Sequence, residues 1–263
     1  MTEDVDSAVR SWELPIETGE MPESGTEFDA IVVGGGPGGS SAAGYLAKSG
    51  ARVLLIEKEV WPRDKICGDA VGGKSLSHVN ELGVKADLES TPHFRVTGIL
   101  FSSPKGNSVR VPLPEEDVEK MEAGYALPRA QFDSLLFNRC QAMVREAGGS
   151  IIQGGEVRTV LFDDGGGGED PGEGSGDARH ATGVVVRIGG RNGEERTFHT
   201  RELVGAGGYR CPVARSVVES SYNEIMMDRD HYCGGYREYW QNVKGCEANV
   251  GDIEIHFVDT VIP

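Results

Sequence analysis

Long apolar runs are missing from this chain of 263 residues, because no stretch approaches the roughly 20 residues that a membrane-spanning helix needs. Any contact with a membrane would therefore be peripheral. The N-terminus is acidic and lacks the apolar segment of a secretory signal. The five cysteines form no C-x-x-C pair, and we predict no metal site. An odd number of cysteines without a signal argues against a disulfide scaffold and favours a reducing cytoplasm.

Basic residues are scarce. The chain has 26 Lys and Arg against 42 Asp and Glu, which gives a formal net charge of −16 at pH 7. Such a charge repels nucleic acid, and no basic stripe is present to bind it. The acidity fits either an acidic tail that binds a partner or a surface adapted to high salt. Because the acidic residues are spread along the chain, we favour a halophilic cytoplasm.

Glycine, in contrast, is abundant, and one cluster of it lies between an apolar strand pattern at 28–33 and an Ala-rich helical pattern. Gly34, Gly36 and Gly39 have the G-x-G-x-x-G spacing of a dinucleotide-binding turn. We expect Gly34 to allow the tight turn, Gly36 to let a pyrophosphate approach the backbone, and Gly39 to let helix and strand pack closely. The pyrophosphate would lie at the helix N-terminus, where unpaired N–H groups and the helix dipole favour negative charge.

A second apolar strand pattern, at 53–56, ends in the carboxylate of Glu57. Its distance from Gly34 is close to the roughly 20 residues expected for an acid that binds ribose. A carboxylate there accepts from both ribose hydroxyls and repels a 2′-phosphate, which favours FAD or NAD over NADP. The alternative is a surface glutamate beside an ordinary βα turn. The order and spacing of strand, glycines, helix and acid favour the nucleotide site.

The rest of the chain alternates strand and helix patterns. We expect a flexible acidic leader at 1–26, a nucleotide-binding domain at 27–220 and the start of a sheet-based second domain at 221–263. A low-complexity loop of glycine and acid at 163–180 is expected to be a solvated hairpin insertion. The expected elements after Glu57 are a loop at 58–73, a helix at 74–82, hairpin strands at 94–101 and 108–113, a strand at 124–127, a helix at 132–148, strands beginning at 151 and 157, strands at 183–188 and 197–200, a strand with a glycine turn at 203–208, a helix at 213–218, and strand-like segments at 232–240 and 253–258.

Three further segments carry a family resemblance: PRDKICGD at 62–69, YALPRAQFD at 125–133 and VGAGGYRCPVAR at 204–215. With the glycine turn, they resemble the geranylgeranyl reductase family of flavoproteins from residue 28 to the end of the chain. The loop Lys65-x-Cys67-Gly68 is the most specific part. With the acidic composition, the chain resembles an archaeal, salt-adapted member.

The resemblance implies an α/β fold: a Rossmann-like FAD-binding domain of the aromatic-hydroxylase type, followed by the start of a β-rich substrate domain. It implies an FAD-dependent reductase that saturates double bonds of geranylgeranyl chains in precursors of archaeal membrane lipids. The partners would be an isoprenoid lipid substrate and an electron donor, NAD(P)H or ferredoxin. The alternatives are an FAD-dependent monooxygenase or related flavin dehydrogenase, or a truncated inactive flavoprotein fragment.

The resemblance also assigns roles to residues. Arg129 would lie against the FAD, and Arg63, Lys65 and Gly68 would belong to the cofactor-binding loop. Cys67 would lie near the isoalloxazine, either donating a proton or packing there, with Arg63 and Lys65 lowering its pKa. The alternatives are a cysteine without chemistry and, at Arg129, a solvent-facing cation at a helix start.

Two features depart from the family's pattern. Gly207-Gly208 stands where related flavoproteins have Asp-Gly, and the family's second flavin segment, a Gly-Asp-Ala turn, is absent from the sequence. We therefore expect this chain to be an N-terminal fragment whose substrate domain is truncated.

Overall fold

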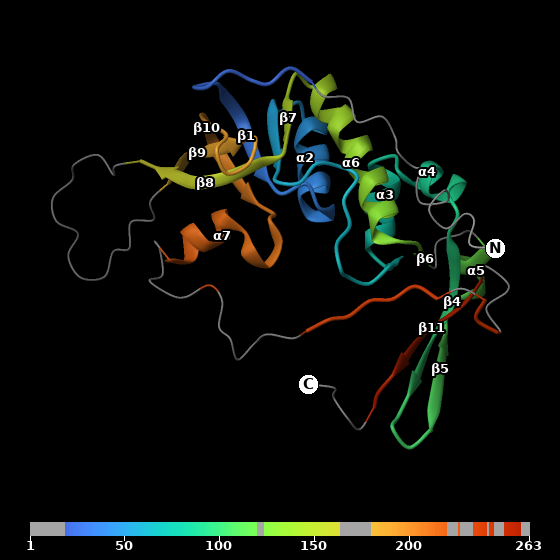
Figure 1. Ribbon diagram of the computed structural model, residues 1–263. Helices are drawn as coiled ribbons and strands as arrows, with labels where there is room; N and C mark the ends of the chain where they lie inside the picture. The colour runs from blue at the N-terminus through green and yellow to red at the C-terminus, as the bar shows by residue number, and fades with distance from the viewer. Residues whose placement is uncertain are drawn as a thin grey trace, which may run out of the picture. The chain divides into compact units, whose positions relative to one another are not determined.

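The apolar runs at 28–33 and 53–56 form neighbouring strands near the centre of a six-stranded sheet. The computed structural model (Figure 1) describes residues 19–119, 124–163, 180–219, 226, 234–240, 242–244 and 250–258. The expected leader up to residue 18 and the low-complexity loop at 164–179 lie outside these ranges. By packing, the chain forms two compact units, one of Met1–Arg63 with Asp133–Gly234 and one of Asp64–Phe132 with Gly235–Pro263.

The sheet of the first unit has the strand order β7-β2-β1-β10-β9-β8. Parallel pairing joins β7, β2, β1 and the second half of β10, whereas β8, β9 and the first half of β10 pair antiparallel. The strand bounds are β1 Glu27–Val33, β2 Val53–Glu57, β7 Ser150–Gln153, β8 Gly155–Phe162, β9 Ala181–Ile188 and β10 Glu194–Gly205. The helices of this unit are α2 Pro37–Lys48, η1 Gly208–Arg210, α7 Pro212–Val217 and, from residue 133 onward, α6 Arg129–Glu146.

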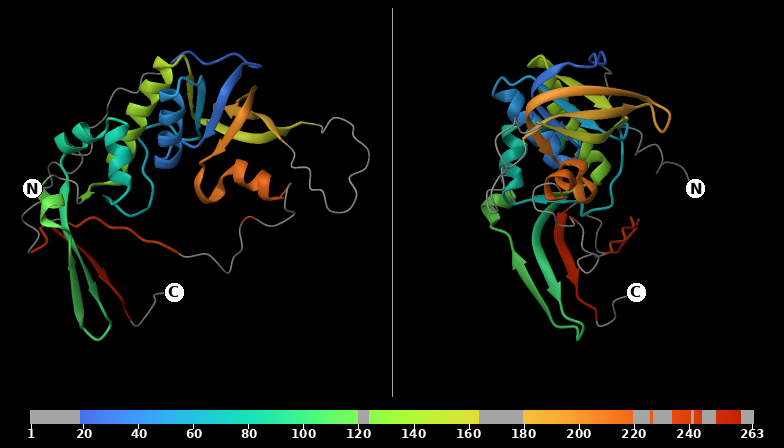
Figure 2. Two further views of the ribbon diagram at one scale, coloured as in Figure 1. Left: turned by 180° about the vertical axis from the view of Figure 1, so that it is seen from behind. Right: turned by 90° about the vertical axis from the view of Figure 1, so that its left-hand side faces the viewer.

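Both faces of this sheet are covered, which explains why β1 and β2 read as continuous apolar runs. Alternate residues of each strand belong to different clusters, as the period of two requires. Ile31 and Leu54 pack with Val213 of α7, whereas Val32 and Leu55 pack with residues of α2 and α6. Figures 1 and 2 show α2 and α6 beside each other along the sheet. The predicted Rossmann-like βαβ unit is confirmed.

One strand differs from expectation. The segments at 197–200 and 203–205, predicted as separate strands, form one continuous strand, β10. Its first half pairs with β9 and its second half with β1, and the change of partner occurs near His199. Thr200 is buried there, and its hydroxyl donates to the carbonyls of Asp29 and Glu202. The polar residues at this crossing interrupt the apolar pattern without interrupting the strand.

The second unit contains a sheet of order β11-β4-β6-β3, with β5 paired to β4. The predicted hairpin is confirmed, and the predicted helix at 74–82 is α3. The segment at 253–258 forms most of β11, which pairs parallel with β4. The bounds are β3 Ala70–Gly72, β4 Phe94–Ser102, β5 Ser108–Pro112, β6 Gly124–Ala126, β11 Val250–His256, α3 Ser75–Glu81, α4 Lys85–Ser90 and α5 Glu115–Glu119.

Other expectations are corrected or stay open. The predicted loop at 58–73 ends in strand β3, because Ala70–Gly72 pairs antiparallel with β6. The part of the predicted strand at 232–240 that the structure describes, 234–240, is not a strand. The packing units do not coincide with the domains expected at 27–220 and 221–263, which stay predictions. Among the described residues, none of the helices combines the length and the apolar character that crossing a bilayer requires.

Candidate functional site

The glycine turn after β1 needs glycine at two positions for steric reasons. Gly34 has a φ of +108°, and a Cβ there would lie 2.4 Å from the carbonyl oxygen of Ala206. A Cβ at Gly39 would lie 1.7 Å from the carbonyl oxygen of Gly34. Both clashes are with backbone, which cannot move aside. The tight turn and the close approach of helix and strand, predicted from the spacing, are therefore present.

The first turn of α2 presents its amide groups without a charged partner from the chain. Gly36 is the N-cap residue and makes no side-chain capping bond, and the first turn of this helix, which the structure describes in full, contains no acidic residue. A Cβ added at Gly38 would meet no described atom within 4 Å. The start of a helix carries unpaired N–H groups and a partial positive charge. Open space in front of such a helix end suits an anionic group like a pyrophosphate.

Glu57 lies at this turn, as its spacing from the glycines predicted. Its side chain is nearly buried, and its two oxygens accept from different amides. Oε2 accepts from the N–H of Gly35 at 2.8 Å, and Oε1 accepts from the N–H of Glu59 at 3.0 Å. These bonds fix the carboxylate next to the glycines, where a ribose would have to lie if its pyrophosphate were at the helix start.

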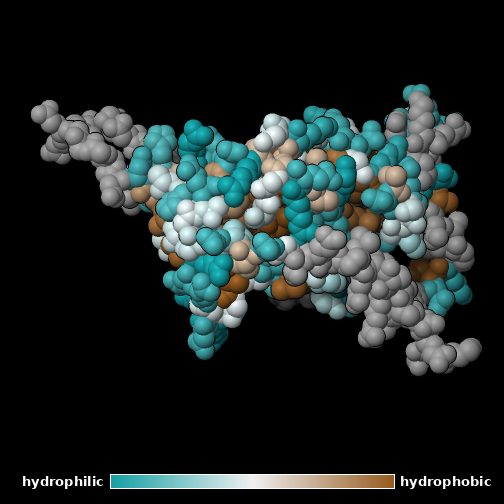
Figure 3. Space-filling model, turned by 90° about the horizontal axis from the view of Figure 1, so that it is seen from above, coloured by the Kyte–Doolittle hydropathy of each residue, from teal (hydrophilic) through white to brown (hydrophobic). Residues whose placement is uncertain are grey.

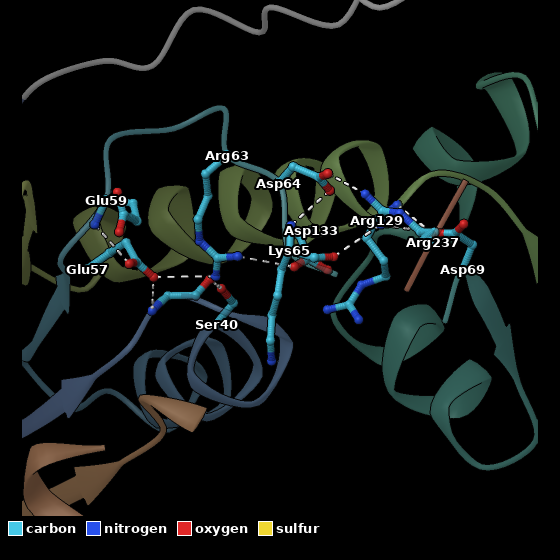
Figure 4. A network of polar contacts seen from close by, with 11 residues as sticks. Ser40, Glu57, Glu59, Arg63, Asp64, Lys65, Asp69, Arg129, Asp133 and Arg237 are labelled. Atoms are coloured by element: carbon cyan, nitrogen blue, oxygen red, sulfur yellow. Dashed lines mark hydrogen bonds and ion pairs between the residues drawn. The ribbon is translucent and has the colours of Figure 1, made fainter. Parts of the chain in front are cut away.

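Arg63 joins Glu57 to a second buried carboxylate (Figure 4). Its Nη2 lies 3.4 Å from Oε2 of Glu57, and its Nη1 lies 3.7 Å from Oδ2 of Asp133. The side chains of Glu57 and Asp133 are only 5% and 1% exposed. A single guanidinium thus lies between two buried carboxylates and forms an ion pair with each of them.

The segment that carries Arg63 is anchored on the sheet. The guanidinium lies over the ring of Trp61, 4.5 Å from its centroid, and Trp61 stacks on Phe137 of α6 with centroids 4.7 Å apart. The backbone N–H of Trp61 donates to Oε1 of Gln153, at the end of β7. These contacts hold Arg63 near the glycine turn, and a Cβ at Gly36 would lie 3.3 Å from its Nη2.

Asp133 ends the segment at 125–133 but has no role predicted from the sequence. It comes one turn before Phe137 on α6, so the two share a face of the helix. Phe137 is fully buried, and a carboxylate on the same face needs a cationic partner. An acidic residue within an apolar helical stripe was the available signal.

The remaining predicted site residues, Lys65, Cys67, Gly68 and Arg129, belong to the second unit. Of the cysteines that the structure describes, Cys67 is exposed and Cys140 and Cys211 are buried. Burial raises the pKa of the Cys140 thiol to about 12, against the opposing charge of Arg139. Of these three residues, only Cys67 is exposed.

Asp69 connects several groups around this loop. Its Oδ1 accepts from the backbone N–H of Arg129 at 3.0 Å and from the hydroxyl of Tyr239 at 3.2 Å. It also lies 3.5 Å from Nη1 of Arg237. Asp69 ends the motif at 62–69 but has no role predicted from the sequence, and no sequence pattern indicated Arg237 or Tyr239. Figure 4 shows Asp64, Asp69 and Arg237 with the loop residue Lys65.

The structure thus brings together Gly34, Gly36, Gly39, Glu57 and Arg63 in the first unit. The roles of these residues, and those of Lys65, Cys67, Gly68 and Arg129, stay predictions.

The chain is also similar to known proteins. The sequence matches the family described as FAD binding domain over residues 27–228. Among curated proteins, it is 30% identical to digeranylgeranylglycerophospholipid reductase 2 of Methanopyrus kandleri over 241 residues, which cover 86% of this chain and 54% of the relative. It is also 30% identical to menaquinone reductase of Mycolicibacterium smegmatis over 141 residues, or 54% of this chain and 32% of the relative.

Among solved structures, the myxobacterial chondrochloren halogenase, an FAD-dependent halogenase, is 28% identical, with a TM-score of 0.58 over 72% of this chain and 38% of the halogenase. The predicted fold class and the resemblance to reductases of geranylgeranyl lipids are therefore confirmed. The chain spans about half, or less, of the length of the curated relatives described here.

Proposed function

Because this chain belongs to the FAD binding domain family, with FAD as its cofactor, we propose that it provides the cofactor site of an FAD-dependent reductase. The proposed substrates are geranylgeranyl chains of archaeal membrane-lipid precursors, whose double bonds become saturated. The observation that carries the cofactor assignment is the bond between Glu57 and the amide of Gly35 in the glycine turn. The similarity to a digeranylgeranylglycerophospholipid reductase over most of this chain supports the substrate class.

The residues of the first unit fit the two polar parts of FAD. The uncapped start of α2 would receive the pyrophosphate, and Glu57 would accept from the ribose hydroxyls. Arg63 lies beside Gly36, so the N–H groups of its guanidinium would be within reach of the phosphates and would donate to them. Asp133 and Trp61 would hold this guanidinium in place.

When bound, reduced flavin would supply a hydride to one alkene carbon, and the other carbon would need a proton from the protein. Cys67 is our candidate for the proton donor because it is an exposed thiol in the loop that most resembles the family. Lys65 and Gly68 would shape the same loop, and Arg129 would contact the cofactor. We place the reaction in the cytoplasm at the membrane periphery, with NAD(P)H or ferredoxin as the electron donor.

The reductase proposal is tested with the purified protein. After incubation with reduced flavin and a digeranylgeranyl glycerophospholipid, the lipid should gain the mass of two hydrogen atoms for each double bond saturated. The Cys67→Ala variant should lose most turnover while its flavin content stays unchanged. A lipid that keeps its mass, with flavin reduced throughout, would reject this substrate class.

A quinone is the second candidate substrate, because the chain is similar to a menaquinone reductase over 141 residues. Incubation of menaquinone under the same conditions decides between the two. Reduction of menaquinone without any change in the lipid favours this candidate, whereas oxygen-dependent oxidation of a phenol would favour a monooxygenase. An inactive fragment would give neither product, and its visible spectrum after gel filtration would show whether flavin is retained.

A further inference from the structure

The loop at 64–69 has an acidic residue at each end, and one arginine far along the chain contacts both. Nη2 of Arg237 donates to Oδ2 of Asp64, and Nη1 of the same guanidinium lies 3.5 Å from Oδ1 of Asp69. Nη1 also donates to the backbone carbonyl of Lys65 at 3.1 Å. The side chain of Arg237 is only 15% exposed, so its guanidinium is largely shielded from water, whereas Asp64 is half exposed.

Tyr239 strengthens the same arrangement. Its hydroxyl donates to Asp69, and the guanidinium of Arg237 lies 4.9 Å from its ring centroid. Partial burial of Tyr239, which is still 58% exposed, together with the negative charge of Asp69 raises its pKa to about 12. The phenol therefore stays protonated, and able to donate, at any pH near neutrality.

This geometry differs from that of an ordinary surface ion pair. A planar guanidinium bonds in more than one direction at once, and here it reaches a carboxylate before Cys67, a carboxylate after it and a carbonyl between them. The segment between the two acids carries Lys65, Cys67 and Gly68. The mobility of this segment therefore depends on a side chain far away in sequence, since Arg237 and Lys65 are 172 positions apart.

We propose that Arg237 is a positioning residue that fixes the 64–69 loop, with Tyr239 as its support, so that the thiol of Cys67 stays at one place. A loss of turnover in Arg237 variants is expected only if Cys67 has its proposed function. A more open 64–69 loop is expected in either case, and it is measurable without any substrate.

The Lys65–Ile66 bond is a trypsin site inside the loop, so its cleavage reports local opening. Arg237→Gln should accelerate this cleavage, located by mass spectrometry, by about fivefold. This is a modest loss of protection, because Asp64 is half exposed. Arg237→Lys, which keeps the charge but not the fork, should restore part of the protection. Asp64→Asn provides a second variant in which the arginine itself is intact.

Arg110→Gln is the matched control. Arg110 forms a two-bond pair with Asp252 in the same unit, at 2.6 and 2.8 Å, and does not contact the loop through any of these bonds. Cleavage after Lys65 should be unchanged in this variant. Equal cleavage rates in the wild type, Arg237→Gln and Asp64→Asn would overturn the proposal.

The effect on turnover separates the two proposals. With a geranylgeranyl lipid, Arg237→Gln should lower kcat at unchanged flavin content and nearly unchanged KM, and Arg237→Lys should recover part of it. If cleavage after Lys65 is faster in Arg237→Gln but the wild type reduces no lipid, the proposed substrate is rejected and the positioning role of Arg237 is supported. If the wild type reduces the lipid but cleavage is unchanged in Arg237→Gln, the positioning role is rejected and the reductase proposal stands.

Discussion

Glu57 combines two roles that are separable by substitution. Its carboxylate accepts from the amides of Gly35 and Glu59, and it shares Arg63 with Asp133. A glutamine at this position keeps an acceptor for one amide but loses the charge and one of the two acceptor oxygens. The hydrogen bond from the N–H of Gly35 stabilises the fold, whereas the negative charge is what would bind a ribose diol and what pairs with the guanidinium.

We therefore expect Glu57→Gln to weaken FAD binding by about tenfold, the loss typical of one charge-assisted hydrogen bond. Quenching of flavin fluorescence on titration with the apoprotein measures this. Glu59→Gln is the matched control, because the side chain of Glu59 is largely exposed and only its backbone N–H serves the turn. Equal affinities in both variants would show that Glu57 does not bind the cofactor.

The cysteines allow a second prediction at this scale. Burial raises the pKa of Cys140 from 9.0 to about 12, so at pH 8 about one thiol in 10,000 is ionised. Iodoacetamide should label Cys67 within minutes and leave Cys140 unlabelled in the folded protein, as peptide mapping will show. Because the raised pKa belongs to the folded state, the neutral thiol contributes stability below about pH 9, and this contribution declines as the pH rises towards 12. Rapid labelling of Cys140 at pH 8 would contradict its burial.

At the scale of elements, the contact between β1 and α2 is the tightest feature of the glycine turn. A methyl group at Gly39 would meet the backbone of Gly34 at 1.7 Å, whereas one at Gly38 would meet nothing within 4 Å among the described residues. Alanine at Gly39 therefore tests the steric requirement for glycine, and alanine at the adjacent Gly38 tests helix propensity alone.

Gly39→Ala should destabilise the apoprotein by about 3 kcal/mol, at the upper end of overpacking costs, because helix and strand must move apart. Gly38→Ala should be neutral or stabilise it by up to about 1 kcal/mol, since alanine favours the helix and meets no obstacle. Urea unfolding followed by far-UV circular dichroism measures both changes. Similar midpoints for the two variants would mean that the close approach is not needed for stability.

Elements whose signals are local were predictable from the sequence. The glycine turn, the strands beside it and the 94–113 hairpin each follow from periodicity and turn residues within short windows. The sequence pattern predicts two strands where β10 is one, because its change of partner at His199 brings polar residues into the apolar pattern. The short strand β3 exists only because β6 pairs with it, and no window of three residues indicates that.

The candidate site shows the same division. Glu57 was predictable because its distance from the glycines is fixed by one βαβ unit. The pairings of Arg63 with Asp133 and of Arg237 with Asp64 depend on how distant segments fold together, and no spacing rule connects them. What the sequence did offer was a chemical conflict, a charge on an apolar helix face, which signals that a partner must exist without identifying it.

At the scale of the whole molecule, the dominant quantity is the net charge of −16. On the face drawn in Figure 3, hydrophilic residues predominate over hydrophobic ones. Like charges at this density repel one another in the folded state more than in an expanded chain, so they lower stability at low ionic strength. Salt reduces this repulsion, because the Debye length falls from about 10 Å at 0.1 M to about 3 Å at 1 M.

We therefore expect the melting temperature to rise by several degrees between 0.05 and 1 M KCl, as differential scanning fluorimetry will show. Potassium sulfate at equal ionic strength separates screening, which is the same for both salts, from the exclusion of sulfate from protein surfaces. A variant in which the exposed Glu20, Glu23 and Glu27 are all replaced by glutamine carries three negative charges fewer and should show a smaller rise. An unchanged melting temperature across this range of KCl would mean that the acidic surface is not an adaptation to salt.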